Sequence, residues 1–339
     1  MNKPLIAITV GDFNGVGPEV VLKSIARRSV RALCTPLLVG PAAVFECYAR
    51  RFGIPLRLEE WKGERVAEAR GTWIVESSTV EPVAIRPGQL SYAAGHAAGT
   101  AITSAAQLAL GGFVDAMVTA PVSKQAMHLA GFTTPGQTEL LQHLSGAHEV
   151  AMMLVAPHMR VGLVTIHAPL ARVASLLTTE RIVRQTRIVH DALVRDWGIM
   201  KPRIALLGLN PHAGEGGDIG TEEQRRILPA MEQLRGKHMA VDGPFPADGF
   251  FARYQPGVYD AVVAMYHDQG LIPLKMSAAN RAVNVTIGLR IIRTSPDHGT
   301  GFQLAGKGVA DATSMEAAIR EAITVAANRG RIRRRRKRT

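Results

Sequence analysis

Three histidines that each follow an apolar, strand-like run are the residues of this chain whose type and spacing best suit chemistry. His167 ends Val-Thr-Ile-His, His212 lies in Leu-Asn-Pro-His-Ala-Gly-Glu, and His267 lies in Ala-Met-Tyr-His-Asp-Gln-Gly. In α/β proteins, ligands bind at the carboxyl ends of the strands. Three imidazoles there could hold one divalent metal ion and leave positions open for a substrate. The repeated context therefore favours a metal site over three separate structural histidines.

Two aspartates could add acid–base chemistry. Asp268 directly follows His267, and Asp248 ends the segment Gly-Pro-Phe-Pro-Ala-Asp. A carboxylate in such a place can bind the metal, act as a base, or orient a ligating histidine. The residues alone leave all three roles open.

Several polar residues beside apolar runs could bind an anion. Lys275, Asn284 and Arg293 would form a clamp for a phosphate or carboxylate if the fold brings them together. Lys124 lies at the start of an expected helix, where a cation opposes the helix dipole. A bound anion would relieve that conflict. Each residue taken singly is more often an ordinary surface residue.

Three polar turns are candidates for ligand contact. The turn 11–17 is rich in glycine, a second turn holds Gln137 and Thr138, and a third, 297–301, contains His298. Backbone N–H groups at such helix starts can bind anions, although tight turns and helix caps explain them equally well. His298 could be a metal ligand, a base or a cofactor contact. The chain lacks Gly-x-Gly-x-x-Gly, so the usual Rossmann dinucleotide domain is not expected.

Apolar runs alternate with helical patterns along most of the chain. Expected strands include 5–10, 36–40, 116–120, 151–156, 161–166, 203–209 and 260–265. Expected helices include 18–29, 41–52, 92–110, 179–196, 221–235 and 313–328. This alternation predicts a mostly parallel sheet covered by helices, in a three-layer α/β/α arrangement. We expect residues 1–328 to form one catalytic unit of two lobes built from interleaved segments.

The composition suits an ordinary soluble protein with ample core. Of 339 residues, 47% are hydrophobic and 20% are charged. No apolar run approaches the roughly 20 residues that span a bilayer, and no signal peptide is visible. The two cysteines indicate neither a disulfide framework nor a cysteine-rich metal site. We therefore expect a cytoplasmic protein with no membrane partner.

The net charge of +12 is concentrated at the carboxyl end. Residues 329–339 hold eight Lys or Arg and no acid, and without those eight the net charge falls to +4. Blocks of like charge repel themselves and are usually disordered. Such a tail could bind nucleic acid or anionic lipid, but a solvated, disordered extension is the favoured interpretation.

Taken together, these motifs resemble one family, the 4-hydroxythreonine-4-phosphate dehydrogenases of vitamin B6 synthesis and their paralogues. The resemblance rests on Gly-Asp-x-x-Gly-x-Gly-Pro-Glu, Leu-Asn-Pro-His-Ala-Gly-Glu, Ala-Met-Tyr-His-Asp-Gln-Gly and Arg-Thr-Ser-x-Asp-His-Gly-Thr, in that order. It covers about residues 4–325. It implies a fold similar to isocitrate and isopropylmalate dehydrogenases, with the active site in the cleft between the lobes.

The resemblance also implies a set of roles. A divalent metal (zinc, magnesium, cobalt or manganese) would bind His167, His212 and His267, with His267 supplied by the second subunit of a homodimer. The positions implied to contact substrate are Gln137, Thr138, Lys275, Asn284 and Arg293. NAD or NADP would be the oxidant, with contacts expected from Asp297, His298, Gly299 and Thr300. The catalytic candidates are Asp248, Asp268 and Lys275, and a water on the metal is a further candidate for the base.

The implied reaction oxidises 4-phosphooxy-L-threonine to 2-amino-3-oxo-4-phosphooxybutanoate, which then loses carbon dioxide to give 3-amino-2-oxopropyl phosphate. Paralogues act on 4-phospho-D-threonate, 4-phospho-D-erythronate or cis-diols of aromatic dicarboxylates. The chain departs from the family at Gln137, where His is usual, and at Phe13-Asn14, where Pro-Ala is usual. Gln cannot become cationic near neutral pH. The departure at Gln137 therefore affects which substrate of the family is expected. A metal-dependent hydrolase or phosphate-handling transferase is the alternative from another class.

Overall fold

The computed structural model describes residues 3–63, 71–81 and 84–336. They form two compact units, each built from separate stretches of the chain. The first unit comprises residues 1–148 and 289–327, and the second comprises residues 149–288 and 328–339. Each unit is thus completed by chain that returns after the other unit.

The first unit contains a parallel sheet with strand order β3-β4-β2-β1-β5-β12. Its described pairings are all parallel. The strands are β1 (Leu5–Thr9), β2 (Thr35–Val39), β3 (Leu58–Glu60), β4 (Thr72–Val75), β5 (Ala116–Val118) and β12 (Arg293–Pro296). β1 and β5 consist entirely of buried residues, as expected of strands covered on both faces.

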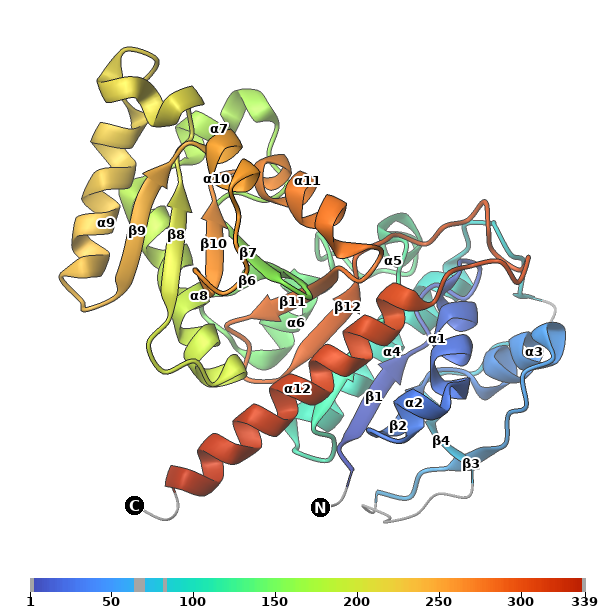
Figure 1. Ribbon diagram of the computed structural model, residues 1–339. Helices are drawn as coiled ribbons and strands as arrows, with labels where there is room; N and C mark the ends of the chain where they lie inside the picture. The colour runs from blue at the N-terminus through green and yellow to red at the C-terminus, as the bar shows by residue number, and fades with distance from the viewer. Residues whose placement is uncertain (1–2, 64–70, 82–83, 337–339) are drawn as a thin grey trace. The chain divides into compact units, whose positions relative to one another are not determined.

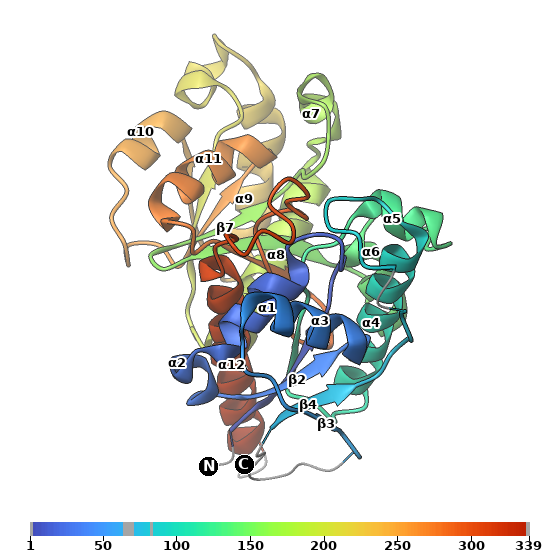
Figure 2. The ribbon, with the colours of Figure 1, turned by 90° about the vertical axis from the view of Figure 1, so that its right-hand side faces the viewer.

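Helices cover both faces of this sheet, with α1 and α12 on one face and α4 on the other (Figures 1 and 2). The helices of the first unit are α1 (Gly17–Ala26), α2 (Arg28–Arg31), α3 (Ala42–Phe52), α4 (Tyr92–Leu110), α5 (Lys124–Leu129), α6 (Gln137–Ser145) and most of α12 (Thr313–Arg336). Ser91 caps α4 by accepting a hydrogen bond from the backbone N–H of Ala94. The three-layer arrangement predicted from the alternating pattern is confirmed here.

The second unit contains a mixed sheet with strand order β11-β6-β7-β10-β8-β9. The strands are β6 (Ala151–Ala156), β7 (Met159–Leu163), β8 (Arg203–Leu207), β9 (Ala240–Phe245), β10 (Ala261–Ala264) and β11 (Val283–Ile287). β7, β10, β8 and β9 run parallel to one another, whereas β6 is antiparallel to both of its neighbours. The prediction of a mostly parallel α/β fold therefore holds for both units.

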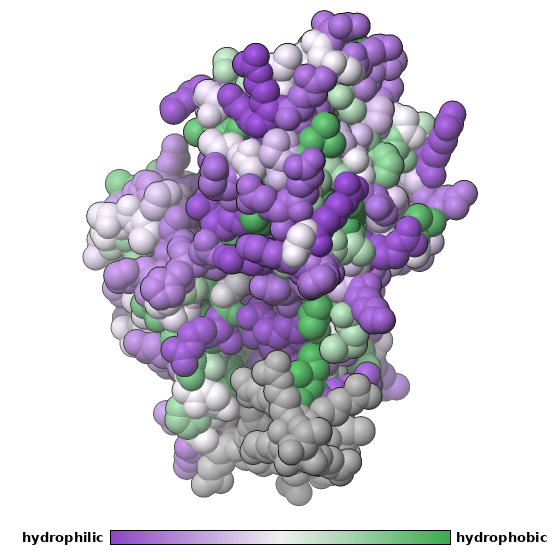
Figure 3. Space-filling model, turned by 90° about the vertical axis from the view of Figure 1, so that its left-hand side faces the viewer, coloured by the Kyte–Doolittle hydropathy of each residue, from purple (hydrophilic) through white to green (hydrophobic). Residues whose placement is uncertain are grey.

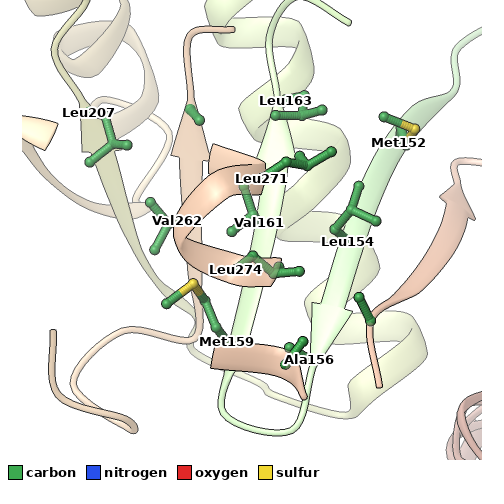
Figure 4. Close-up of a cluster of buried hydrophobic side chains, with 13 residues drawn as sticks. Met152, Leu154, Ala156, Met159, Val161, Leu163, Leu207, Val262, Leu271 and Leu274 are labelled. Atoms are coloured by element: carbon green, nitrogen blue, oxygen red, sulfur yellow. The ribbon is translucent and has the colours of Figure 1, made fainter. Parts of the chain in front are cut away.

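The core of the second unit lies between its sheet and α11 (His267–Ala278) (Figure 4). Leu271 and Leu274 of α11 pack with Val161 of β7. Gly162 faces the opposite side, where a Cβ would lie 2.5 Å from Val189. The remaining helical segments are α7 (Leu170–Leu176), α8 (Thr179–Trp197), the 3-10 turn η2 (Pro211–Gly217), the π turn η3 (Glu223–Ile227), α9 (Leu228–Arg235) and α10 (Ala247–Ala252).

The structure differs from the sequence expectations at two helices. The expected helix 221–235 is interrupted at its start by the π turn η3. α12 continues to Arg336, so residues 329–336 of the basic tail are helical, where the sequence predicts disorder. Asp196, which is 1% exposed, accounts for the start of this extension because it accepts a hydrogen bond from Arg329 Nε at 2.7 Å.

In the described part of the chain, none of the helices is both long and apolar enough to cross a membrane. The face shown in Figure 3 is largely hydrophilic, with hydrophobic residues in small groups.

Candidate active site

The three histidines singled out by the sequence follow three neighbouring strands of the second unit. His167 lies beyond β7, His267 beyond β10 and His212 beyond β8. These strands are adjacent and parallel in the order β7-β10-β8. Their carboxyl ends therefore lie along one edge of the sheet, with neighbouring strands about 4.8 Å apart. The fold places all three histidines at the rim where the sequence predicts them.

His167 and His267 lie side by side. Their ring centroids are 6.0 Å apart and their planes are inclined by 41°. The ends of β7 and β10 thus place two imidazoles near each other at this edge of the sheet.

Asp268 contacts His267. Its Oδ1 lies 2.7 Å from Nδ1 of the imidazole. A carboxylate on one ring nitrogen fixes the tautomer and leaves the other nitrogen, Nε2, as the ligating atom. Of the three roles considered for Asp268, orientation of a ligating histidine is the one that this contact supports.

His212 lies in an unusual backbone segment. Residues 212–216 of η2 all have positive φ angles, and His212 itself has φ 53°. Its side chain is exposed. Among the described residues, no three His, Cys, Asp or Glu side chains come together as a metal site. The structure thus brings two of the predicted ligands together and sets the third on the neighbouring strand end. That the second subunit of a homodimer supplies His267 to the metal site stays a prediction.

Three further predicted site residues belong to the second unit. Asp248 lies on α10 and Lys275 on α11, and both are exposed. Lys275 is eight residues after His267 on the same helix, a rise of about 12 Å. Asn284 of β11 donates from Nδ2 to the sulfur of Met152 at 3.3 Å, while its buried Oδ1 has no protein partner in the described structure. An unsatisfied buried acceptor of this kind is consistent with a ligand contact.

In the first unit, Arg293 anchors a second group of predicted residues. Arg293 begins β12 and is 3% exposed. It donates from Nε and Nη2 to Thr119 Oγ1 at 3.0 and 2.8 Å, and from Nη2 to Gln137 Oε1 at 3.1 Å. Burial lowers the pKa of Arg293 to about 10, although the nearby Glu139 opposes the shift. The guanidinium is therefore a buried cation at neutral pH.

The start of α6 adds further positive potential beside Arg293. Gly136 precedes the helix in an extended conformation, and no side chain caps α6. Gln137 and Thr138 supply the first N–H groups of this helix. A Cβ on Gly136 would lie 3.7 Å from Lys124 Nζ. The same Cβ would lie 3.0 Å from Glu139 Oε2, so one carboxylate stands beside the two cations. The amino end of a helix with two cations and one acid nearby can bind a phosphate or carboxylate.

The two glycine-rich turns of the first unit lie against each other. The N–H of Val16 donates to the carbonyl of Thr300 at 2.8 Å. The N–H of Asp297 donates to Ser314 Oγ at 3.1 Å, which holds the start of the loop 297–300. His298 and Gly299 are exposed at its tip. The loop expected to contact the cofactor is thus hydrogen-bonded at both ends and exposed at its tip.

Asp12 is a buried polar residue to which the sequence assigned no role. It is fully buried, and its Oδ2 has no partner among the described residues. Burial raises the pKa of Asp12 to about 6, against the lowering effect of backbone N–H groups at Asn14, Gly15 and Ser123. Its position in the turn 11–17 was the available signal, but only the fold shows that the carboxyl is enclosed.

The departure at Phe13-Asn14 has a structural explanation. Phe13 is fully buried, and its carbonyl accepts a hydrogen bond from Tyr48 at 2.6 Å. Asn14 donates from Nδ2 to Gln89 O and to Ser91 Oγ at 2.9 and 3.1 Å. These two residues hold neighbouring segments in place.

Comparison with known proteins identifies the family. The family described as "Pyridoxal phosphate biosynthetic protein PdxA" matches residues 32–322. The chain belongs to the PdxA family. A relative from Trichlorobacter lovleyi, named 4-hydroxythreonine-4-phosphate dehydrogenase, is 45% identical over 96% of this chain and 99% of its own. A relative from Cupriavidus necator, named D-threonate 4-phosphate dehydrogenase, is 44% identical over 96% of this chain and 98% of its own.

Solved structures of PdxA relatives agree with this assignment. A 4-hydroxythreonine-4-phosphate dehydrogenase from Klebsiella pneumoniae superposes with a TM-score of 0.87 at 39% identity, over 96% of this chain and 98% of the other. A terephthalate 1,2-cis-dihydrodiol dehydrogenase from Burkholderia xenovorans gives a TM-score of 0.65 at 32% identity, over 95% and 98%. The relatives are dehydrogenases by name, which confirms the prediction that this PdxA member is an oxidoreductase.

Proposed function

We propose that this chain is a metal-dependent dehydrogenase, linked to NAD or NADP, that oxidises a phosphorylated hydroxy acid. The favoured substrate is 4-phosphooxy-L-threonine, in the synthesis of pyridoxal phosphate. The observation that carries the proposal is that His167, His267 and His212 follow three adjacent, parallel strands, β7, β10 and β8. In a member of this family, this placement supports a divalent metal held by His167 and His212, with His267 supplied by the second subunit.

The residues of the second unit would bind the substrate hydroxyl and help to remove its proton. When bound, the metal lowers the pKa of a hydroxyl that it contacts. Asp268 keeps the imidazole of His267 in its ligating tautomer. Because Asp268 is engaged in this way, Asp248 is the carboxylate that remains to accept a proton. Lys275 and Asn284 would bind oxygen atoms of the substrate.

The residues of the first unit would hold the anionic group and the cofactor. Arg293, fixed by Thr119 and Gln137, provides a buried positive charge. Lys124 and the N–H groups of Gln137 and Thr138 at the start of α6 extend this anion site. Residues 297–300 would contact NAD or NADP, and the dinucleotide would receive the hydride. We further propose a cytoplasmic homodimer whose active site is completed by the second subunit.

A second candidate substrate is 4-phospho-D-threonate, with 4-phospho-D-erythronate beside it. Gln137 favours this possibility because a neutral amide, tied to Arg293, stands where the family usually has an imidazole. The 44% identity to a D-threonate 4-phosphate dehydrogenase is similar to the identity to the other relatives. An aromatic cis-diol is less well supported, since the buried Arg293 and the nearby Lys124 suit a phosphate.

A substrate panel tests the proposal. Metal-loaded protein receives each of the three phosphorylated acids with NAD or NADP, and NADH or NADPH formation is followed by absorbance. Turnover of 4-phosphooxy-L-threonine that is lost in His212→Ala is the expected result. Turnover of the threonate or erythronate alone would assign the paralogue's substrate. No reduction of either cofactor with any of the acids would contradict the dehydrogenase and favour a metal-dependent hydrolase or transferase.

A further inference from the structure

Glu19 and Lys23, two charged residues outside the expected site, bind the backbone of a loop that is distant along the chain. Glu19 of α1 is fully buried, and its Oε1 accepts hydrogen bonds from Lys23 Nζ and from the N–H of Ala310, both at 2.7 Å. Lys23 Nζ also donates to the carbonyls of Gly308 and Ala310 at 2.8 and 2.9 Å. An ammonium group has three N–H donors, so these contacts use all of them.

The bound loop is the segment 297–312, which joins β12 to α12 and whose described residues all lie outside helices and strands. The helix α1 holds it at two places. The N–H of Val16, which directly precedes α1, donates to the carbonyl of Thr300 at 2.8 Å. The ion pair holds the far end of the loop, about one to two turns further along the helix. A single helix therefore fixes both ends of the loop relative to each other.

The ion pair and the loop stabilise each other. A buried carboxylate costs free energy unless it is paired and hydrogen-bonded. The second oxygen of Glu19, Oε2, has no hydrogen-bond partner among the described residues, so the contacts at Oε1 provide the stabilisation. Loss of the Lys23 ammonium would leave Glu19 with the N–H of Ala310 alone and would release two loop carbonyls.

The tip of this loop, which begins at Asp297 and ends at Thr300, has groups that a dinucleotide could use. A carboxylate at Asp297 and an imidazole at His298 can bind ribose hydroxyls and ring nitrogens. His298 and Gly299 are exposed, and a Cβ on Gly299 would meet nothing within 4 Å. A Cβ on Gly15, by contrast, would lie 2.7 Å from Thr300 O. The tip therefore packs tightly against the glycine-rich turn before α1 on one side and is open on the other.

We propose that Glu19 and Lys23 are positioning residues for NAD or NADP, which fix the segment 297–312 on α1 and thereby hold its tip in the form that binds the dinucleotide. The inference rests on the proposed function, because it takes residues 297–300 as the cofactor contact. Neither side chain needs to touch the cofactor, since each acts through the backbone of the loop, as the supporting residues of a binding site do. All of these contacts lie within the first unit of one chain.

The test uses the full-length chain and two variants of the ion pair. Lys23→Met keeps a side chain of similar length and removes the ammonium. The double variant Glu19→Gln/Lys23→Met removes both charges together, so that no unpaired carboxylate is buried. Arg27→Met is the matched control, because it breaks a different ion pair beside the same helix, that of Arg27 Nε with Glu316 Oε1 at 2.6 Å.

Three measurements are made on each protein. Dissociation constants of NADH and NADPH are obtained from nicotinamide fluorescence without substrate, and amide hydrogen exchange over residues 297–310 is followed without cofactor. KM for the dinucleotide, KM for the phosphorylated acid and kcat complete the set. Both variants of the ion pair are expected to bind the dinucleotide about tenfold more weakly, to exchange residues 297–310 faster and to raise KM for the dinucleotide alone. Arg27→Met should match wild type.

Wild-type dissociation constants and exchange rates in both variants of the ion pair would overturn the proposal. An equal rise in the two KM values, or a loss of kcat at saturating dinucleotide, would also overturn it, because either result indicates a general structural role. If Lys23→Met does not fold, the double variant alone decides.

The variants Asp297→Ala and His298→Ala separate this inference from the proposed function. Weak dinucleotide binding by these two, together with wild-type binding by the variants of the ion pair, would overturn the positioning role alone. A wild-type protein that binds neither NADH nor NADPH, or whose affinity neither Asp297→Ala nor His298→Ala changes, would overturn the cofactor role of residues 297–300 and with it the positioning role.

Discussion

Gln137 shows how one side chain can set the electrostatics of a binding site. Arg293 can only donate, so the atom of Gln137 that it contacts must be the amide oxygen. The amide N–H₂ group is therefore the part of Gln137 that remains for a ligand. A ligand there must present an acceptor, and its binding should be insensitive to the protonation of residue 137.

The variant Gln137→His tests this interpretation. An imidazole can carry a proton below a pH of about 6.5, and its positive charge would then attract the anionic substrate. We expect KM of the variant to rise several-fold between pH 6 and pH 8 relative to wild type. The measurement is KM against pH for the substrate that turns over, with wild type as the reference. Identical KM profiles in the two proteins would show that residue 137 does not face the anion.

Asp12 should make stability depend on pH. Burial raises its pKa from 3.8 to about 6 in the folded state, so the folded protein binds the proton more tightly than the unfolded chain. The associated stability is fully present below about pH 4 and is lost as pH rises through 6. A shift of this size corresponds to about 3 kcal/mol.

Asp12→Asn should remove that loss. We expect the free energy of unfolding of wild type to fall by about 3 kcal/mol more than that of the variant between pH 4 and pH 7. Urea denaturation at a series of pH values measures it, with Asp191→Asn, at a largely exposed carboxylate, as the control. Parallel curves for wild type and Asp12→Asn would contradict the enclosed carboxyl.

At the scale of elements, the strand ends organise the site. The apolar runs of β1, β5 and β10 were predictable because aliphatic residues fill both faces of buried parallel strands. β11 and β12 were missed because Asn284 and Arg293 interrupt their apolar pattern. The sequence indicates both polar residues as ligand contacts. Because they interrupt the apolar pattern, they also make each strand hard to recognise. Only tertiary packing can reveal such a strand.

The left-handed turn 212–216 was likewise beyond prediction from sequence. The glycines at 214, 216 and 217 indicate a tight turn, but His212 gives no local signal for a positive φ. Its conformation depends on Glu223, which is distant along the chain and reaches back from η3. The motif could be recognised in the sequence, whereas its left-handed backbone conformation could not.

Gly214→Ala and Gly216→Ala form a matched pair for this turn. Both glycines have positive φ, but a Cβ at 214 meets Glu223 Oε2 at 2.7 Å and Gly220 O at 2.8 Å, whereas a Cβ at 216 meets nothing within 4 Å. We expect Gly216→Ala to cost about 1 kcal/mol from backbone strain alone. Gly214→Ala should cost about 1–3 kcal/mol more and weaken zinc binding. Urea denaturation and chelator competition measure the two effects. Equal losses in both variants would contradict the packing of Glu223 against the turn.

At the scale of the whole molecule, the basic tail contributes to folding through one buried acid. Burial opposes ionisation of Asp196, but hydrogen bonds from Arg195 and Arg329 hold its pKa below the ordinary value. The stability that Asp196 contributes is therefore present at neutral pH and is lost as pH falls. The sequence showed the charge of the tail but not this acid, because Asp196 is distant along the chain and lies in a helix.

Deletion of residues 329–339 tests the role of the tail. The loss of Arg329 leaves Asp196 with Arg195, so we expect the free energy of unfolding to fall by about 1–3 kcal/mol at pH 7. The penalty should shrink below about pH 4. Arg329→Gln in the full-length chain should reproduce most of the effect. A truncated protein as stable as wild type at pH 7 would show that the helical extension makes no contribution.

Oxidation by this protein should require a metal held by the three histidines. The most direct measurement is turnover and zinc content of chelator-treated protein as metal is restored. We expect activity to be lost with the metal and to return in proportion to one bound ion per chain, whereas His167→Ala should neither bind the ion nor recover. Full activity in metal-free protein, or recovery by His167→Ala, would contradict it.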